Sequence, residues 1–335
     1  MAKIVLGMGT SHGPMLSTPP EQWDLRVVAD RSNREHWFRG KTYDFDQLVE
    51  LRKDENFAPQ ITLEKWRERH AACQSAIGRM RAIFEEARPD VAVIVGNDQK
   101  EIFTDANMPA FFVYRGESLR NGPYSQEILD RLAPGVAEAR AGHLPPDWTQ
   151  YPCAPRLADH LVRAVMDQGF DVSVSNAFPS GPRGNHVPHA FGFVYRQIMV
   201  DRVIPNVPVF INTFYPPNQP TAQRAFDFGQ ALCAAIESWP EDQRVVVICS
   251  GGLSHFVIDE ELDRRVIDGL KTRDFGALTS IPENYFQAGT SELKNWIPVA
   301  GVMARAGLPM ELVDYVPCYR SMAGTGTANG FVVWR

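Results

Sequence analysis

Short and nearly continuous apolar runs alternate along this chain with segments of helical periodicity. Runs rich in β-branched residues are typical of strands that helices bury on both faces. The alternation predicts one α/β domain over residues 1–335, with a central and mostly parallel sheet flanked by helices. The expected strands are Lys3–Gly7, Val91–Gly96, Phe111–Tyr114, Asp171–Asn176, Val207–Phe214, Arg244–Ser250 and Phe331–Trp334. The expected helices are Leu63–Ala87, Ser125–Leu132, Pro155–Gln168, Thr221–Trp239, Glu260–Leu270 and Ser291–Ala306.

Residues 15–60 interrupt this alternation. They are rich in Pro, Trp, Arg and Asp and carry little strand signal. A long segment of this kind in a compact domain is usually functional or disordered. Its aromatic residues favour an ordered structure, so we expect a cover over a site or a subunit contact.

The charge and cysteine content exclude several classes of protein. The net charge is −6 and no run of Lys and Arg occurs, which argues against a nucleic-acid or anionic-membrane surface. No segment approaches the roughly 20 apolar residues of a membrane span. The 5 cysteines are far apart and form neither a disulfide framework nor a CxxC motif. We therefore expect a cytoplasmic protein, with a homodimer as the default assembly.

Four short polar clusters end an expected strand or open an expected helix. They carry His12, Gln99, His255 and Glu292. Side chains at the carboxyl ends of strands in α/β sheets face the crevice where ligands bind, so the clusters predict one metal site built from distant parts of the chain. A Pro- and Gly-rich loop adds two histidines, His186 and His189. These are either metal ligands or an acid–base histidine with a supporting neighbour.

The order of these clusters resembles that of the class III extradiol ring-cleaving dioxygenases, the superfamily of the protocatechuate 4,5-dioxygenase catalytic subunit. The resemblance spans nearly the whole chain, and its most specific element is the Gly-Gly-Leu-Ser-His sequence. The matching segments are Ser11-His12, Asn97-Asp98-Gln99, His189-Ala190-Phe191, Gly251–His255 and Ala288–Trp296.

This resemblance implies a non-haem Fe(II) held by two histidines and a carboxylate, with open positions for a diol and O₂. His12 and Glu292 would be ligands. His255 would be the acid–base residue, and His189 a second hydrogen-bonding histidine. The implied substrate is a small dihydroxylated aromatic or a hydroxylated N-heterocycle.

Gln99 departs from the family pattern, which has a metal-binding histidine at this position. Three interpretations follow. The Gln99 amide oxygen binds the metal and shifts its preference towards harder ions such as Mn(II). Glu101, two residues on, binds instead. Or the site has lost its metal, which leaves a metal-free or catalytically silent ligand-binding protein. A metal-dependent hydrolase is a further alternative.

A carboxylated substrate would call for an arginine that pairs with the carboxylate through two hydrogen bonds. Two positions are candidates for substrate binding. Arg183 lies next to the histidine loop, and Arg320 precedes a segment of small residues.

Overall fold

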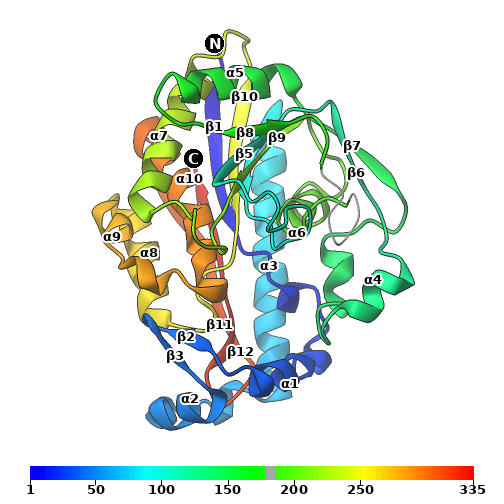
Figure 1. Ribbon diagram of the computed structural model, residues 1–335, viewed down its shortest axis with the longest axis vertical. Helices are drawn as coiled ribbons and strands as arrows, with labels where there is room; N and C mark the ends of the chain where they lie inside the picture. Colours follow the sequence, from blue (N-terminus) through cyan, green and yellow to red (C-terminus); the bar gives the residue numbers. More distant parts are fainter. Residues whose placement is uncertain (179–185) are drawn as a thin grey trace.

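The computed structural model describes residues 1–178 and 186–335. Within these ranges a nine-stranded sheet forms the centre of the molecule (Figure 1). Its strand order is β11-β13-β1-β10-β4-β9-β5-β8, and β12 pairs with β13. Strands β1, β10, β4 and β9 run parallel, whereas β13 pairs antiparallel with its neighbours. The predicted α/β class with a mostly parallel central sheet is confirmed.

Most of the expected elements are present, with small shifts at their ends. The sheet strands are β1 (Lys3–Thr10), β4 (Val91–Gly96), β5 (Phe111–Tyr114), β8 (Ser173–Ser175), β9 (Asn206–Ile211), β10 (Arg244–Ser250), β11 (His255–Val257), β12 (Met310–Tyr319) and β13 (Thr325–Trp334). Two short pairs lie outside it, β2 (His36–Phe38) with β3 (Lys41–Tyr43) and β6 (Ser118–Asn121) with β7 (Thr149–Pro152). The helices are α1 (Leu25–Ser32), α2 (Phe45–Leu51), α3 (Leu63–Ala87), α4 (Gln126–Arg131), α5 (Pro155–Met166), α6 (His189–Phe193), α7 (Ala222–Glu237), α8 (Glu260–Thr272), α9 (Gly276–Thr279) and α10 (Leu293–Ala306).

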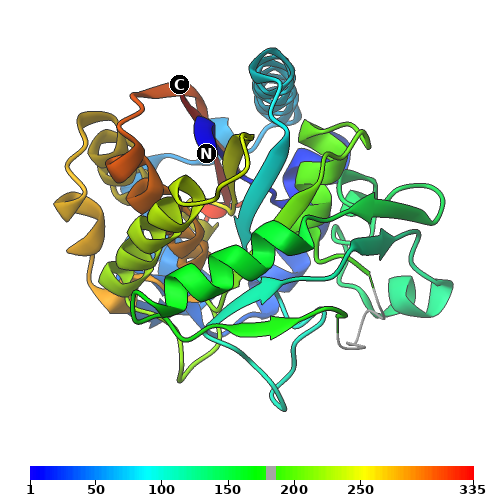
Figure 2. The ribbon, with the colours of Figure 1, turned by 90° about the horizontal axis from the view of Figure 1, so that it is seen from above.

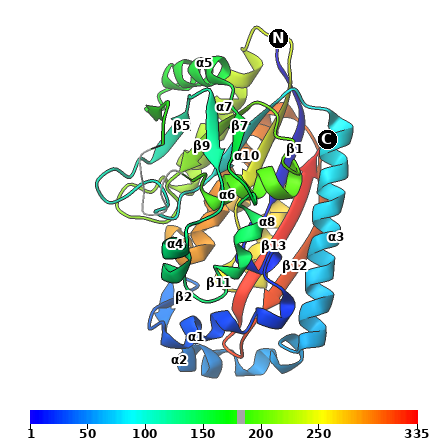
Figure 3. The ribbon, with the colours of Figure 1, turned by 90° about the vertical axis from the view of Figure 1, so that its right-hand side faces the viewer.

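The sheet separates two apolar layers, because side chains alternate between the faces of a strand. In β4, Val93 and Val95 pack into one layer, whereas Ala92 and Ile94 pack into the other. The first layer is covered by α5, α7, α8 and α10, and the second by α3 and α6. Figure 2 shows α3 on one side of the sheet and α7 with α10 on the other, and Figure 3 shows α3 running along β12.

The register of the parallel strands brings their carboxyl ends to one edge. Thr10 at the end of β1 pairs with Ser250 at the end of β10. Cys249 pairs with Val95, one residue before the end of β4. The segments that follow these three strands therefore start side by side, and they lead to His12, His255 and Gln99.

Strand β12 was not among the expected elements. Among the described residues it pairs only with β13, so it forms an edge of the sheet, and it contains Asp314 and Pro317. Proline is tolerated in edge strands because one side of such a strand makes no ladder hydrogen bonds. The same residues interrupt the apolar pattern by which a strand is recognised in sequence.

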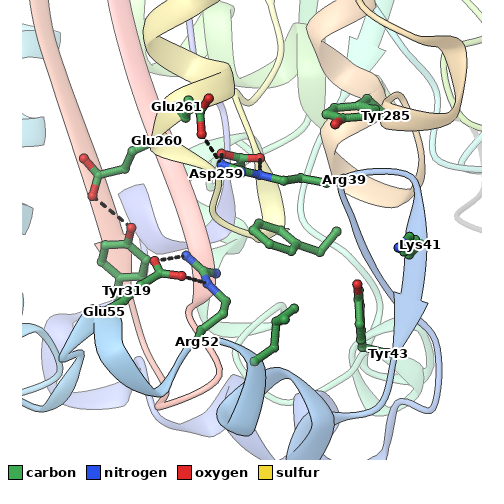
Figure 4. A pocket seen from close by; sticks show the side chains of 12 residues that line it. Arg39, Lys41, Tyr43, Arg52, Glu55, Asp259, Glu260, Glu261, Tyr285 and Tyr319 are labelled. Atoms are coloured by element: carbon green, nitrogen blue, oxygen red, sulfur yellow. Dashed lines mark hydrogen bonds and ion pairs between the residues drawn. The ribbon is translucent and has the colours of Figure 1, made fainter.

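Residues 15–60 form ordered structure that includes α1, the β2–β3 hairpin and α2, grouped at one end of the molecule (Figures 1 and 3). Trp23 is buried within the second apolar layer. Arg39 in the hairpin pairs through two hydrogen bonds of 2.7 and 2.8 Å with Asp259, which precedes α8 (Figure 4). In the described parts of the chain, no helix has both the length and the apolar character that a membrane crossing needs.

Candidate metal centre and active site

His12 lies two residues beyond the end of β1 and is buried. Its Nδ1 is 2.9 Å from Ser250 Oγ, and Ser250 donates its own proton to the Ala190 carbonyl at 2.6 Å. Because that hydroxyl has one proton to donate, it accepts from the His12 Nδ1–H, and Nε2 is left as an electron-pair donor. Burial lowers the pKa of His12, although the nearby Glu292 opposes the shift, so the neutral ring is favoured.

Glu292 ends a 3₁₀ turn, Ala288–Glu292, that continues directly into α10. Its Oε2 accepts from the Gly252 main-chain N–H at 2.8 Å and lies 3.0 Å from His12 Nε2. Its Oε1 accepts from the Gln99 side-chain amide at 3.1 Å. Burial disfavours ionisation of Glu292, but the positive charge that the His12 and His255 rings carry when protonated outweighs it and holds the pKa of Glu292 well below the usual range. The carboxylate is therefore charged and fixed in place.

His189 is the first residue of α6, and its ring lies against that of His12, with centroids 4.7 Å apart. Glu101 Oε2 accepts from the main-chain N–H of His189 at 2.8 Å and lies 2.9 Å from ring Nδ1. A carboxylate on Nδ1 fixes the tautomer that presents Nε2 to a ligand.

His12, His189 and Glu292 form a group whose ligand atoms all lie within 4.8 Å of one another. Two imidazole nitrogens and one carboxylate are the donor set of mononuclear non-haem iron sites. Nε2 of His12 is buried without a hydrogen bond among the described residues, despite its closeness to Glu292. A buried acceptor without a partner is costly, and a divalent cation would satisfy it. The residues present thus fit a metal ion.

His255 opens β11 and is buried beside this group. Its Nδ1 lies 2.8 Å from the Leu253 carbonyl, so Nδ1 carries the proton and Nε2, 3.6 Å from Glu292, is basic. Burial alone would lower the pKa of His255, but Glu292 raises it overall. A Cβ atom at Gly252 or Gly289 would collide with the imidazole, which explains why glycines flank this histidine in space.

A cavity of about 220 Å³ opens onto these residues. His12, His189, His255 and Glu292 line its polar part. The remaining lining is largely apolar or cationic and comes from Gly13, Pro14, Ser17, Arg26, Gln99, Val136, Ala139, Gly142, His143, Phe193, Phe256, Arg320 and Thr327. A dry cavity of about 150 Å³ holds benzene, so this one accommodates a single substituted ring.

The other predicted site residues lie in different surroundings. Gln99 lines the cavity, but its amide nitrogen points to Glu292. Glu101 contacts His189 and is not a member of the three-residue ligand group. His186 packs against Tyr124 and Trp148, outside the lining of the cavity in the described structure.

The two candidate arginines differ as well. Arg320 lines the cavity, but Asp30 accepts hydrogen bonds from its Nε and Nη2 at 2.7 and 2.8 Å. Arg183 falls outside the described residues.

Three further contributors were not expected from the sequence. Ser250 orients His12, while Arg26 and His143 line the cavity. Ser250 directly precedes the Gly-Gly-Leu-Ser-His sequence, so its position at a strand end was a usable signal. Arg26 and His143 lie in stretches without periodicity, and no local pattern marks them.

A larger hollow, of about 640 Å³, lies beside the β2–β3 hairpin (Figure 4). Its charged groups largely satisfy one another: Arg39 pairs with Asp259 and Glu261, and Arg52 pairs with Glu55. The smaller cavity, where the histidines converge, is therefore the candidate active site.

Comparison with known proteins agrees with this geometry. Residues 59–332 match the family described as the catalytic LigB subunit of aromatic ring-opening dioxygenase. A 2,3-dihydroxyphenylpropionate/2,3-dihydroxicinnamic acid 1,2-dioxygenase from Comamonas testosteroni is 29% identical over 186 residues, which cover 55% of this chain and 49% of that protein. A gallate dioxygenase from Pseudomonas putida is 54% identical over 185 residues, 51% of each chain.

The chain thus spans about half the length of the curated relatives it matches. The family match, in contrast, covers most of the chain and extends from before β4 to within β13. It includes Gln99, His189, His255 and Glu292. The chain belongs to the family of the catalytic LigB subunit of aromatic ring-opening dioxygenases.

Proposed function

We propose that this protein is a metal-dependent extradiol dioxygenase that opens the ring of a small dihydroxylated aromatic, or of a hydroxylated N-heterocycle, with O₂. One observation carries the proposal. Two histidines and a glutamate, with ligand atoms within 4.8 Å of one another, lie beside a fourth ionisable group, His255, in a cavity of single-ring size. Family membership supports the same class of reaction.

The metal ligands are His12, His189 and Glu292. The ion is Fe(II), with Mn(II) as the alternative. In this assignment His189 supplies the second imidazole that the sequence lacks at position 99. Gln99 acts as a hydrogen-bond donor that holds Glu292 Oε1. When bound, such an ion supplies open coordination positions for a diol and for O₂.

His255 is the acid–base residue. Its Nδ1–H is held by the Leu253 carbonyl, which leaves Nε2 to accept a proton from a substrate hydroxyl. Glu292, 3.6 Å away, stabilises the protonated ring that results. The same nitrogen can return the proton to an oxygen of the opening ring, so one histidine serves both halves of the reaction.

Apolar residues position the ring. Val136, Ala139 and Phe193 form an apolar part of the cavity lining. They exclude water from the faces of the substrate ring. We also propose that residues 15–60 act as a cover, because Ser17 and Arg26 from this segment line the cavity.

Oxygen consumption tests the proposed function. The protein is freed of metal, loaded anaerobically with Fe(II) or Mn(II), and mixed with a panel of catechols and dihydroxypyridines in an oxygen electrode. We expect oxygen uptake together with a yellow ring-opened product for at least one compound. Full metal loading without oxygen uptake across the panel would reject the dioxygenase function.

A further inference from the structure

The cavity contains a cationic group that takes no part in the proposed metal binding or acid–base catalysis. Arg26 lies in the first turn of α1 and lines the cavity near Arg320. It is half-buried, and it makes no hydrogen bond or ion pair within residues 1–178 and 186–335 that the structure describes. Its Nε is fully buried without a partner. Buried charges are ordinarily paired, so this arginine calls for an explanation.

The local sequence would predict a partner for Arg26. Asp30 follows four residues later on the same helix, the spacing at which opposite charges pair. Both oxygens of Asp30 instead receive hydrogen bonds from Arg320, 290 residues away in sequence, at 2.7 and 2.8 Å. Thr325 donates to Asp30 as well, at 2.7 Å. Three hydrogen bonds therefore commit Asp30 to Arg320 and Thr325.

The result is an excess of positive charge at the cavity wall. Two guanidinium groups, Arg26 and Arg320, face one carboxylate, Asp30. Burial and the charge of Arg320 lower the pKa of Arg26 to about 10, so the group stays protonated at neutral pH but is destabilised as a cation. An anion in the cavity would remove this cost.

We propose that Arg26 is a specificity-determining residue that binds a carboxylate substituent on the substrate ring. This inference rests on the proposed function and narrows its substrate class to aromatic acids. A guanidinium pairs with a carboxylate through two parallel hydrogen bonds, which sets the orientation of the ring as well as its affinity. Arg320 cannot take this role, because its Nε and Nη2 are committed to Asp30.

Equilibrium binding to metal-free protein tests the proposal without turnover. The probes are 4-hydroxybenzoate and its neutral amide, 4-hydroxybenzamide, which share size and shape. We expect wild-type protein to bind the acid roughly ten- to a hundred-fold more tightly than the amide, as for a hydrogen-bonded charge pair. Arg26→Met should abolish the preference. Arg34→Met, which removes an exposed arginine just beyond the end of α1, should retain it.

Equal binding of the two probes by wild-type protein would overturn the proposal even if the Arg26→Met variant fails to fold. So would a preference that persists in a folded Arg26→Met variant. In turnover, the same substitution should raise KM for a carboxylated catechol by a larger factor than KM for catechol. If Arg26 is needed for the preference for the acid over the amide but no catechol is opened, the carboxylate-binding role stands and the dioxygenase function is rejected. Failure of the carboxylate-binding role can therefore be told apart from failure of the proposed function.

Discussion

Glu101 contacts both the main chain and the ring of His189: Glu101 Oε2 lies 2.8 Å from the His189 main-chain nitrogen and 2.9 Å from its ring Nδ1. The contact fixes both the start of α6 and the orientation of the imidazole. It also accounts for the presence of an acid two residues beyond Gln99. In our account Glu101 is a positioning residue, and the ligand to the metal is the histidine that it orients.

Replacing Glu101 should therefore weaken the metal site indirectly. We expect Glu101→Gln to lower Fe(II) or Mn(II) affinity by roughly ten- to a hundred-fold, as for other hydrogen-bond partners of metal-binding histidines. Competition with a metal-sensitive chelator measures the change. Glu50→Gln, on the exposed side of α2, is the matched control and should bind metal like wild type. Unaltered affinity in Glu101→Gln would count against this role.

His255 should be needed for turnover but not for metal binding. We expect His255→Ala to lower kcat by roughly 10²- to 10⁴-fold, the usual contribution of a general acid–base group. Metal content should stay at the wild-type level, because His255 lies outside the ligand group. Metal analysis and oxygen uptake on the same sample check the unchanged metal content and the lowered kcat. A variant that turns over normally would remove His255 from the mechanism.

Asp263 should make stability depend on pH. It is fully buried, and burial raises its pKa from 3.8 to about 7 despite hydrogen bonds from Ser254 and Tyr315. The folded protein therefore binds a proton that the unfolded chain has lost, so stability falls as pH rises from about 4 to 7. The full loss is on the order of 4 kcal/mol.

Urea unfolding at pH 5 and pH 8 measures this effect. Asp263→Asn mimics the protonated acid, so the difference in unfolding free energy between the two pH values should shrink relative to wild type. If the difference in unfolding free energy between pH 5 and pH 8 is the same in both proteins, Asp263 is not the source of the pH dependence.

The ion pairs that attach residues 15–60 to the rest of the chain should contribute unequally to the free energy of unfolding. Asp30 and Arg320 are both buried, and leaving one of them alone costs about 3–5 kcal/mol. Asp30→Ala should therefore lower the free energy of unfolding by that amount. Arg39→Met should cost at most about 1 kcal/mol, because the Arg39 side chain is 41% exposed and solvent screens its pair with Asp259. Chemical denaturation of the two variants would show the contrast, and equal losses would contradict it.

The fold and much of the site could be predicted from sequence because both depend on short-range patterns. Buried strands such as Val91–Gly96 are continuous apolar runs, and polar residues follow this strand directly, beginning with Asn97, Asp98 and Gln99. Parallel pairing then brings these ends together, as Thr10 and Ser250 show.

Local sequence patterns do not show which charged side chains pair with each other in the folded protein. Nothing local indicates that Asp30 pairs with Arg320 and leaves Arg26 exposed to the cavity, because the pairing depends on how α1 packs against the turn between β12 and β13. The direction of the Gln99 amide is set in the same way, by the position of Glu292.

Metal binding by two matched variants tests the central assignment most directly. Wild-type protein, His189→Ala and Gln99→Ala are loaded anaerobically with Fe(II), desalted and analysed for iron. We expect about one equivalent of iron in wild type and in Gln99→Ala, and less than about a tenth in His189→Ala, because loss of a ligand leaves two donors. The opposite pattern, with iron lost from Gln99→Ala and retained by His189→Ala, would contradict it and return the ligand role to Gln99.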